Sequence, residues 1–198
     1  LSDRKSLRNK LDAARFAWTC TDANGEFLRS LGSTTPVHVG YHGTRLDGPA
    51  APRASSADRR ILAVGRLVPK KGLIDLVRAC ALLRDQGSAF SLSVVGDGPE
   101  RGPLEAEVKS LGLGEQVSFL GALPPSEVRE HYRQASLFVL PCIVLENGDR
   151  DGIPNVLVEA MTAGLPVIST RVSAIPELIR DNVTGLLVDP HAPEQLAQ

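Results

Sequence analysis

The chain has 198 residues, enough for one large domain or for one domain with part of another. Its 42% hydrophobic and 23% charged residues are typical of a globular protein, and a net charge of −1 gives no basis for binding nucleic acid. Cys20, Cys80 and Cys142 lack the spacing of a metal site or a disulfide framework, which favours a cytoplasmic setting. No stretch is apolar enough to predict a membrane span or a signal peptide.

Residues 1–35 differ in pattern from the rest of the chain. A charged helical start leads into a short apolar run and then a helical turn, residues 26–32, that ends at a glycine. Residues 37–41 alternate like a strand, and small residues and proline over residues 47–59 have the composition of a linker. We therefore expect residues 1–35 to be the remnant of an N-terminal domain, and residues 36–60 to form a hinge strand and linker.

From residue 61 onward, short apolar runs alternate with amphipathic segments of helical length. Six strands are expected, at residues 61–64, 90–95, 117–120, 137–140, 166–169 and 185–188. Helices are expected between them, at residues 73–84, 99–111, 125–135, 153–163 and 175–180. Because no hairpin signal joins neighbouring strands, each connection must cross over, which gives a parallel sheet covered on both faces. The predicted fold of residues 61–198 is a doubly wound α/β domain.

A glycine and a proline mark the start of the helix predicted at residues 153–163. Gly152 permits a sharp bend, and the fixed φ angle of Pro154 suits the first turn of a helix, so the helix is predicted to begin near residue 153. The first amides of a helix have no intrahelical partner and carry part of a positive charge, so they can bind an anion such as a phosphate. The candidate donors are the amides of Ile153, Asn155 and Val156.

Two carboxylates, Asp151 and Glu159, flank this predicted helix start. They cannot both be phosphate ligands, so we interpret them as acceptors for the hydroxyl groups of a sugar or ribose. Together with the amides, they indicate a nucleotide sugar as ligand. The alternative is that both are ordinary acidic residues, one complementing the helix dipole and the other facing solvent. This segment alone supports the two interpretations about equally.

Cations follow the strand predicted at residues 61–64. Ligands of parallel α/β sheets bind at the carboxyl ends of the strands, where Gly65, Arg66 and Lys71 are expected. Arg66 offers a planar fork for phosphate oxygens, and Lys71 a mobile point charge. We interpret Arg66 as functional because it lies in a tight strand exit, whereas Lys70 is interpreted as a solvated residue.

The chain also contains weak matches to other kinds of site. Residues 96–102 approach a dinucleotide-binding fingerprint, but the third glycine is one residue late and no acidic residue ends the next strand. The histidines show no metal-ligand spacing, and no Gly-x-Ser-x-Gly nucleophile motif is present. NAD binding, metal binding and nucleophilic catalysis are therefore disfavoured. His42 lies in the join between the two parts of the chain and is interpreted as a turn residue.

Four stretches match the pattern of a known family, in order: residues 64–72, 95–99, 151–168 and 177–188. They resemble the group 1 (family 4) retaining glycosyltransferases over roughly residues 36–198. Residues 148–155 are most similar to bacterial enzymes that build exopolysaccharide, colanic-acid type repeats or lipopolysaccharide cores. That family has the GT-B fold, in which two Rossmann-like domains face each other across a cleft. The resemblance implies that residues 61–198 form the C-terminal, donor-binding half, and that most of the N-terminal domain is missing.

The resemblance also implies partners and a location. The donor substrate would be a nucleoside-diphosphate sugar, with no other cofactor, no metal and no nucleic acid. The acceptor would be a saccharide or a lipid-linked saccharide, held mostly by the missing N-terminal domain. The enzyme would be cytoplasmic, or at the inner face of the membrane, where the missing half would make any peripheral membrane contact. Without that half the chain is expected to be inactive.

Site residues carry over from the resemblance position by position. Gly65, Arg66 and Lys71 would bind the diphosphate. Gly152 and the amides of Ile153, Asn155 and Val156 would meet the phosphate and the donor sugar, while Glu159 would accept hydrogen bonds from the ribose. Asp151 would hold the far side of the sugar, and here the chain departs from the family, which usually has glutamate.

The implied reaction transfers a hexosyl group with retention of configuration. As the bond from sugar C1 to the phosphate oxygen breaks, the leaving diphosphate gains negative charge, which Arg66, Lys71 and the helix start would stabilise. Divalent metals take this role elsewhere. The catalytic residues would then be Arg66, Lys71 and Asp151. The alternatives are a sugar-nucleotide epimerase of the same shape and a non-enzymatic binding module.

Overall fold

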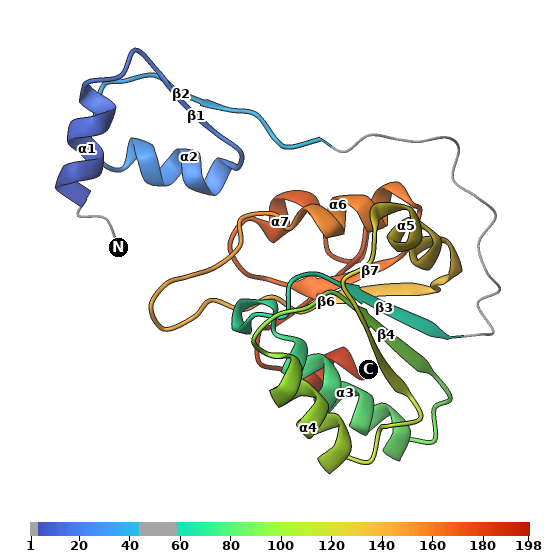
Figure 1. Ribbon diagram of the computed structural model, residues 1–198. Coiled ribbons are helices and arrows are strands. Elements are labelled where there is room, and N and C mark those ends of the chain that lie inside the picture. Colours follow the sequence, from blue (N-terminus) through green and yellow to red (C-terminus); the bar gives the residue numbers. More distant parts are fainter. Residues whose placement is uncertain (1–3, 44–58) are drawn as a thin grey trace.

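The computed structural model describes residues 4–43 and 59–198. A small N-terminal unit, residues 4–43, precedes a larger α/β domain, residues 59–198 (Figure 1). The unit contains, in order, α1 (Arg4–Asp12), β1 (Ala17–Thr19), α2 (Asp22–Arg29) and β2 (Val37–Val39). Strands β1 and β2 pair in parallel, so the strand predicted at residues 37–41 is present, though shorter. The predicted linker, residues 47–59, lies almost wholly outside the described residues.

The α/β domain is built on a six-stranded sheet in the order β5-β4-β3-β6-β7-β8. Every neighbouring pair of strands is parallel. The strands are β3 (Arg60–Val64), β4 (Ser91–Val95), β5 (Val117–Gly121), β6 (Leu137–Leu140), β7 (Val167–Thr170) and β8 (Leu186–Val188). All six lie within one residue of their predicted bounds. The parallel α/β prediction is therefore confirmed.

Helices cover both faces of the sheet, as in a doubly wound fold. Helices α3 and α4 lie on one face and α5, α6 and α7 on the other (Figure 1). Their bounds are α3 (Leu73–Asp85), α4 (Arg101–Ser110), α5 (Pro125–Gln134), α6 (Asn155–Thr162) and α7 (Ile175–Leu178). Two short elements were not predicted, the 3₁₀ turn η2 (Pro69–Lys71) and α8 (Pro193–Leu196), which packs against α3. Three or four residues are too few to show a helical period.

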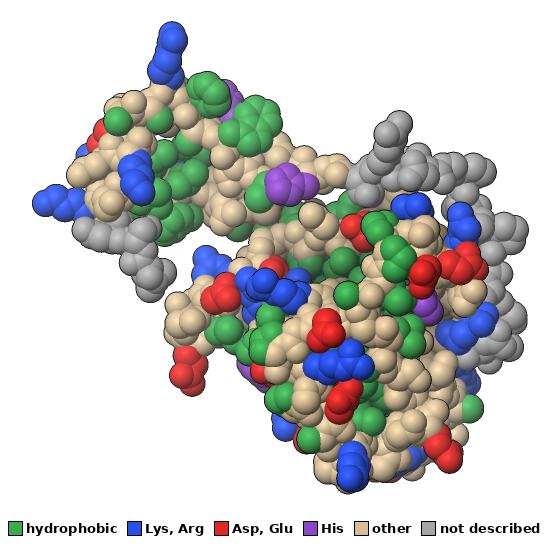
Figure 2. Space-filling view, viewed as in Figure 1, with side chains coloured by type: hydrophobic (Ala, Val, Ile, Leu, Met, Phe, Trp, Pro, Cys, Tyr) green, Lys and Arg blue, Asp and Glu red, His purple; other side chains and the backbone are tan. Residues whose placement is uncertain are grey.

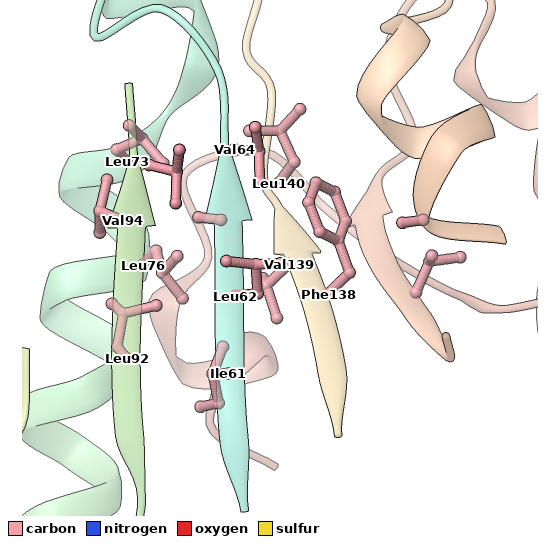
Figure 3. Packing of buried hydrophobic residues seen from close by; sticks show 14 of the residues in the cluster. Ile61, Leu62, Val64, Leu73, Leu76, Leu92, Val94, Phe138, Val139 and Leu140 are labelled. Carbon is pink, nitrogen blue, oxygen red and sulfur yellow. The ribbon is translucent and has the colours of Figure 1, made fainter. Parts of the chain in front are cut away.

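The hydrophobic core fills the space between the sheet and its helices. Strand β3 is buried along residues 61–64 because neither of its faces meets water, which explains its unbroken apolar run. Figure 3 shows Leu73 and Leu76 of α3 packed beside β3 and β4. Each fully buried side chain of this size contributes about 1.5–3 kcal/mol. The largest of them are Phe138, Leu62, Leu67, Leu92, Leu104, Leu113, Leu140, Leu157, Ile175 and Ile179.

The direction of strand addition reverses at the centre of the sheet. Strands β3, β4 and β5 are added toward one edge, whereas β6, β7 and β8 are added toward the other. The reversal lies between β3 and β6, where Ile61 pairs with Leu137. In open α/β sheets, ligands bind outside the carboxyl ends of the strands at such a point. The loops that leave β3 (residues 65–72) and β6 (residues 141–154) therefore flank the expected crevice.

Candidate functional site

The loops after β3 and β6 are joined closely to each other. The Ile143 amide donates a hydrogen bond to the Lys70 carbonyl, at 2.9 Å. Gly72 has a φ angle of +63°, and a Cβ atom there would lie 1.9 Å from the Pro141 carbonyl oxygen. Only glycine combines this backbone conformation with so close an approach. The two loops therefore form one continuous surface at the switch point of the sheet.

Four charged side chains meet where these loops join, and we call them the ionic cluster: Lys70, Lys71, Asp149 and Asp151. The Lys71 ammonium lies 2.7 Å from Asp151 Oδ2, and both side chains are largely buried, at 13% and 19% exposed. Lys70 Nζ lies 3.0 Å from Asp149 Oδ1 and 3.6 Å from Asp151 Oδ1. The formal charges of the cluster sum to zero.

The interpretation of Lys70 as a solvated residue is wrong. Its side chain is only 20% exposed and contacts both carboxylates of the cluster. The hydrogen bond to Asp149 raises the pKa of Lys70, and the charge of Asp151 adds to this shift. The mistake arose because both partners lie on the other loop, about 80 residues away in sequence.

Of the two predicted phosphate-binding cations, Lys71 belongs to the ionic cluster and Arg66 does not. Gly65 lies beside Lys71, because a Cβ atom on Gly65 would be 3.7 Å from Lys71 Cε. Arg66 is exposed, and its guanidinium has no hydrogen-bond or ion-pair partner within residues 4–43 and 59–198. Lys71 is therefore held in place by Asp151, whereas Arg66 supplies a positive charge that is not balanced by a neighbour.

A buried thiol, that of Cys142, contacts the Asp151 carboxylate. Cys142 is 1% exposed, and its Sγ atom lies 3.8 Å from Asp151 Oδ2. Burial raises the pKa of Cys142 to about 12, so the thiol is neutral at physiological pH. Within the described residues, no group of three or more His, Cys, Asp or Glu side chains could hold a metal ion.

Helix α6 begins two residues later than predicted. Pro154 is its N-cap, with φ −61° and ψ 124°, and the Pro154 carbonyl accepts a hydrogen bond from the Leu157 amide at 3.0 Å. The open amides of the first turn are therefore those of Asn155 and Val156, which have no acceptor in the described part of the chain. Ile153 precedes the helix, so its expected place in the first turn is corrected. Proline fits the N-cap as well as the first turn, so sequence alone could not separate the two.

Glu159 lies one turn further along α6 and has a partner that sequence analysis did not identify. The Tyr132 hydroxyl, from α5, donates a hydrogen bond to Glu159 Oε2 at 3.1 Å. Burial raises the pKa of Tyr132, and the charge of Glu159 raises it further, so the hydroxyl remains a donor. A tyrosine on the apolar face of an amphipathic helix carries no signal beyond core packing.

Glu177 joins the N-terminal unit to the α/β domain. Its Oε2 accepts a hydrogen bond from the Asp22 amide and its Oε1 one from the Ala23 amide, both at 2.8 Å, at the start of α2. The Tyr41 hydroxyl lies 3.0 Å from Glu177 Oε2 and donates a hydrogen bond to Asp22 Oδ2 at 2.7 Å. The hydrogen bond to Asp22 raises the pKa of Tyr41, and Glu177 acts in the same direction. Asp22 and Glu177 are 155 residues apart in sequence, and no sequence pattern predicted their contact.

A pocket of about 160 Å³ lies between the unit and the domain. Figure 2 shows the unit standing over the domain with a hollow between them. His42, interpreted from the sequence as a turn residue, lines the pocket from an irregular segment. Gly152 lies at the same boundary, because a Cβ atom added there would be 3.5 Å from Thr21 Cγ2. The lining residues are Cys20, Thr21, Tyr41, His42, Ile153, Asn155, Val158, Glu177 and Leu178.

Comparison with known sequences identifies relatives in bacterial polysaccharide synthesis. The chain is 41% identical over 139 residues to the amylovoran biosynthesis glycosyltransferase AmsK of Erwinia amylovora, covering 70% of this chain and 33% of that protein. It is 37% identical over 150 residues to the putative colanic acid biosynthesis glycosyltransferase WcaL of Escherichia coli K12, covering 76% of this chain and 37% of that protein. The chain thus spans about a third of the length of these relatives. No helix among the described residues is long and apolar enough to cross a membrane.

Comparison with solved structures supports the same assignment. The crystal structure of HepE from Anabaena, in complex with UDP and glucose, superposes with a TM-score of 0.79. The match covers 98% of this chain and 56% of that one, at 22% sequence identity, so it shows a shared fold. This fold is the one expected for the C-terminal half of a GT-B glycosyltransferase. Residues 49–198 match the family described as "Glycosyl transferases group 1", and the chain therefore belongs to that family.

Proposed function

We propose that this chain is the donor-binding part of a retaining, metal-independent hexosyltransferase of bacterial polysaccharide biosynthesis. Its donor would be a nucleoside-diphosphate sugar, and its acceptor a saccharide or lipid-linked saccharide. The observation that carries the proposal is the ion pair of Lys71 with Asp151 at the switch point of the sheet, on the loop that leads directly into the open amides at the start of α6. The relatives named for amylovoran and colanic acid biosynthesis support the process, and HepE bound to UDP and glucose supports the class of donor.

The chemistry of the proposed reaction requires positive charge where the diphosphate leaves. Departure of the nucleoside diphosphate from sugar C1 builds negative charge on its terminal phosphate. Arg66, Lys71 and the amides of Asn155 and Val156 would stabilise this charge without a metal ion. Retention would follow if the acceptor attacks on the face from which the diphosphate departs. The pocket between the unit and the domain lies beside Asn155, where an acceptor hydroxyl could approach the donor sugar.

Lys71 would serve two partners in turn. Its ammonium is held by Asp151, which keeps the flexible side chain in one position. When a diphosphate binds, Lys71 would contact the phosphate oxygens, while Asp151 would accept hydrogen bonds from hydroxyls of the donor sugar. Aspartate reaches less far than the glutamate usual in the family. In this chain the contacts of Asp151 with Lys70 and Lys71 hold the short carboxylate close to the loop after β3.

Calorimetric titration of the chain with UDP, GDP and ADP tests donor binding. We expect one of the three to bind, and the affinity to be the same in EDTA as in magnesium. The absence of heat with all three at millimolar concentration would contradict the proposed donor site. Binding that requires magnesium would contradict only the metal-independent part. An epimerase is not favoured, because the relatives from Erwinia amylovora and Escherichia coli are both named glycosyltransferases.

The variant Asp151→Asn should distinguish the contribution of the donor sugar to binding from that of the diphosphate. Affinity for the nucleoside diphosphate should be unchanged or higher, because Lys71 loses a competing anion. The additional affinity that the donor sugar provides should fall about tenfold, the size expected for a hydrogen bond to a charged acceptor. Calorimetry with the diphosphate and with its sugar conjugate measures both.

Asp149→Asn is the matched control, since it removes the same charge from the ionic cluster at a more exposed position, 53% exposed. It should leave the contribution of the sugar unchanged. An equal loss in both variants would mean that charge, and not contact with the sugar, accounts for the effect of Asp151.

A further inference from the structure

Tyr132 holds one oxygen of the Glu159 carboxylate. Tyr132 is 4% exposed, and its ring packs against that of Phe138 with centroids 5.8 Å apart, so the position of its hydroxyl is fixed by the core. The hydroxyl lies 3.1 Å from Glu159 Oε2 and 3.4 Å from the Val156 carbonyl oxygen. Its single proton goes to the carboxylate, because this acceptor is nearer and charged.

The other carboxylate oxygen is available to a ligand. Glu159 is half-buried, and its Oε1 atom has no hydrogen-bond partner in the described residues. Asn155 and Glu159 are four residues apart on α6, so they lie on the same face of the helix. The backbone of Glu159 is therefore about one turn further along the helix than the open amides that would hold a phosphate, and its side chain leans back toward them.

We propose that Tyr132 is a positioning residue that enables Glu159 to distinguish ribose from deoxyribose in the bound nucleotide. This inference rests on the proposed function, in which Glu159 accepts hydrogen bonds from the ribose hydroxyls. A free glutamate side chain has several rotamers, and fixing it on binding costs conformational entropy. Tyr132 fixes the carboxylate before the ligand arrives, so the ribose meets a preorganised acceptor. The buried tyrosine also keeps its proton, because burial and the charge of Glu159 both raise its pKa.

Tyr132→Phe tests the inference, because it removes the hydroxyl and keeps the ring in the core. Calorimetry with whichever nucleoside diphosphate binds, and with its 2′-deoxy analogue, gives the preference for ribose. We expect that preference to fall by about 2- to 12-fold, the range for one hydrogen bond. Affinity for the deoxy analogue should change less. In a Glu159→Ala background, Tyr132→Phe should have no further effect on the preference, since there is no carboxylate left to position.

Each outcome of this experiment decides between explanations. An equal loss of affinity for both nucleotides, in both backgrounds, would assign Tyr132 a purely structural role and overturn the inference. An unchanged ribose preference in a variant that still binds would overturn it while leaving the proposed function intact. A wild-type chain that binds no nucleoside diphosphate would remove the proposed function itself. Glu159→Asp provides a second variant, because a carboxylate shortened by one methylene withdraws from the Tyr132 hydroxyl and should lower the preference in the same way.

Discussion

Lys71→Ala is expected to weaken the binding of nucleoside diphosphate by about 1.5–3 kcal/mol, roughly 10- to 150-fold in Kd. Two effects act in the same direction. The diphosphate loses a charged hydrogen-bond donor, and Asp151 loses the counter-ion that lies 2.7 Å away, so a carboxylate then faces the incoming anion. We therefore expect the upper part of this range for Lys71. Isothermal titration calorimetry measures the change in Kd. The ionic strength must be held fixed, because salt screens exposed charges.

Three variants make this experiment specific. Arg66→Ala should cost less than Lys71→Ala, since Arg66 is exposed and its removal uncovers no carboxylate. Lys109→Ala, at the exposed end of α4, removes the same charge from a distant helix and should leave Kd unchanged. The double variant Lys71→Ala/Asp151→Asn should regain part of the lost affinity, because the repelling carboxylate is gone. An unchanged Kd in Lys71→Ala would place the diphosphate away from the ionic cluster.

Gly72→Ala is expected to lower the free energy of unfolding by at least about 3 kcal/mol and to abolish nucleotide binding. An alanine at a φ angle of +63° costs about 1–2 kcal/mol by itself. Its Cβ atom would also lie 1.9 Å from the Pro141 carbonyl oxygen, so the loops after β3 and β6 must move apart. That movement would separate Lys71 from Asp151. Urea denaturation gives the stability, and calorimetry gives the binding.

Two other glycines separate the causes of this loss. Gly87 has a similar φ angle, +74°, but a Cβ atom there would have no neighbour within 4 Å, so Gly87→Ala should cost only the conformational term. Gly102 lies inside α4 with open space around it, so Gly102→Ala should stabilise the domain by up to about 1 kcal/mol. Equal losses in Gly72→Ala and Gly87→Ala would show that the close approach of the loops carries no cost.

Much of the fold could be predicted because its signals are local. A strand buried on both faces must be apolar along its whole length, and residues 61–64 and 137–140 show this directly. Crossovers follow from the absence of hairpin turns, so the parallel sheet needed no long-range information. The start of α6 was misplaced because Pro154 suits two positions at a helix terminus. The short helix α8 has too few residues to produce a period.

The site could be predicted only where chemistry and spacing coincide on one segment. Glycine before proline, with carboxylates on either side, indicated residues 151–159 as a candidate binding segment at a helix start. The contacts of Lys70, Tyr132 and Glu177 could not be predicted, because their partners lie 79, 27 and 155 residues away. Such contacts depend on how the elements are placed in space, and one sequence contains no direct record of that placement.

The contact made by Glu177 affects how the unit and the domain can move. One carboxylate accepts two amide hydrogen bonds at the start of α2, so much of the joint consists of polar groups. Water can replace such partners at a net cost of about 1 kcal/mol per bond, whereas parting a large apolar interface would cost far more. We therefore expect this contact to open and re-form at low cost, while the packing of the sheet stays undisturbed.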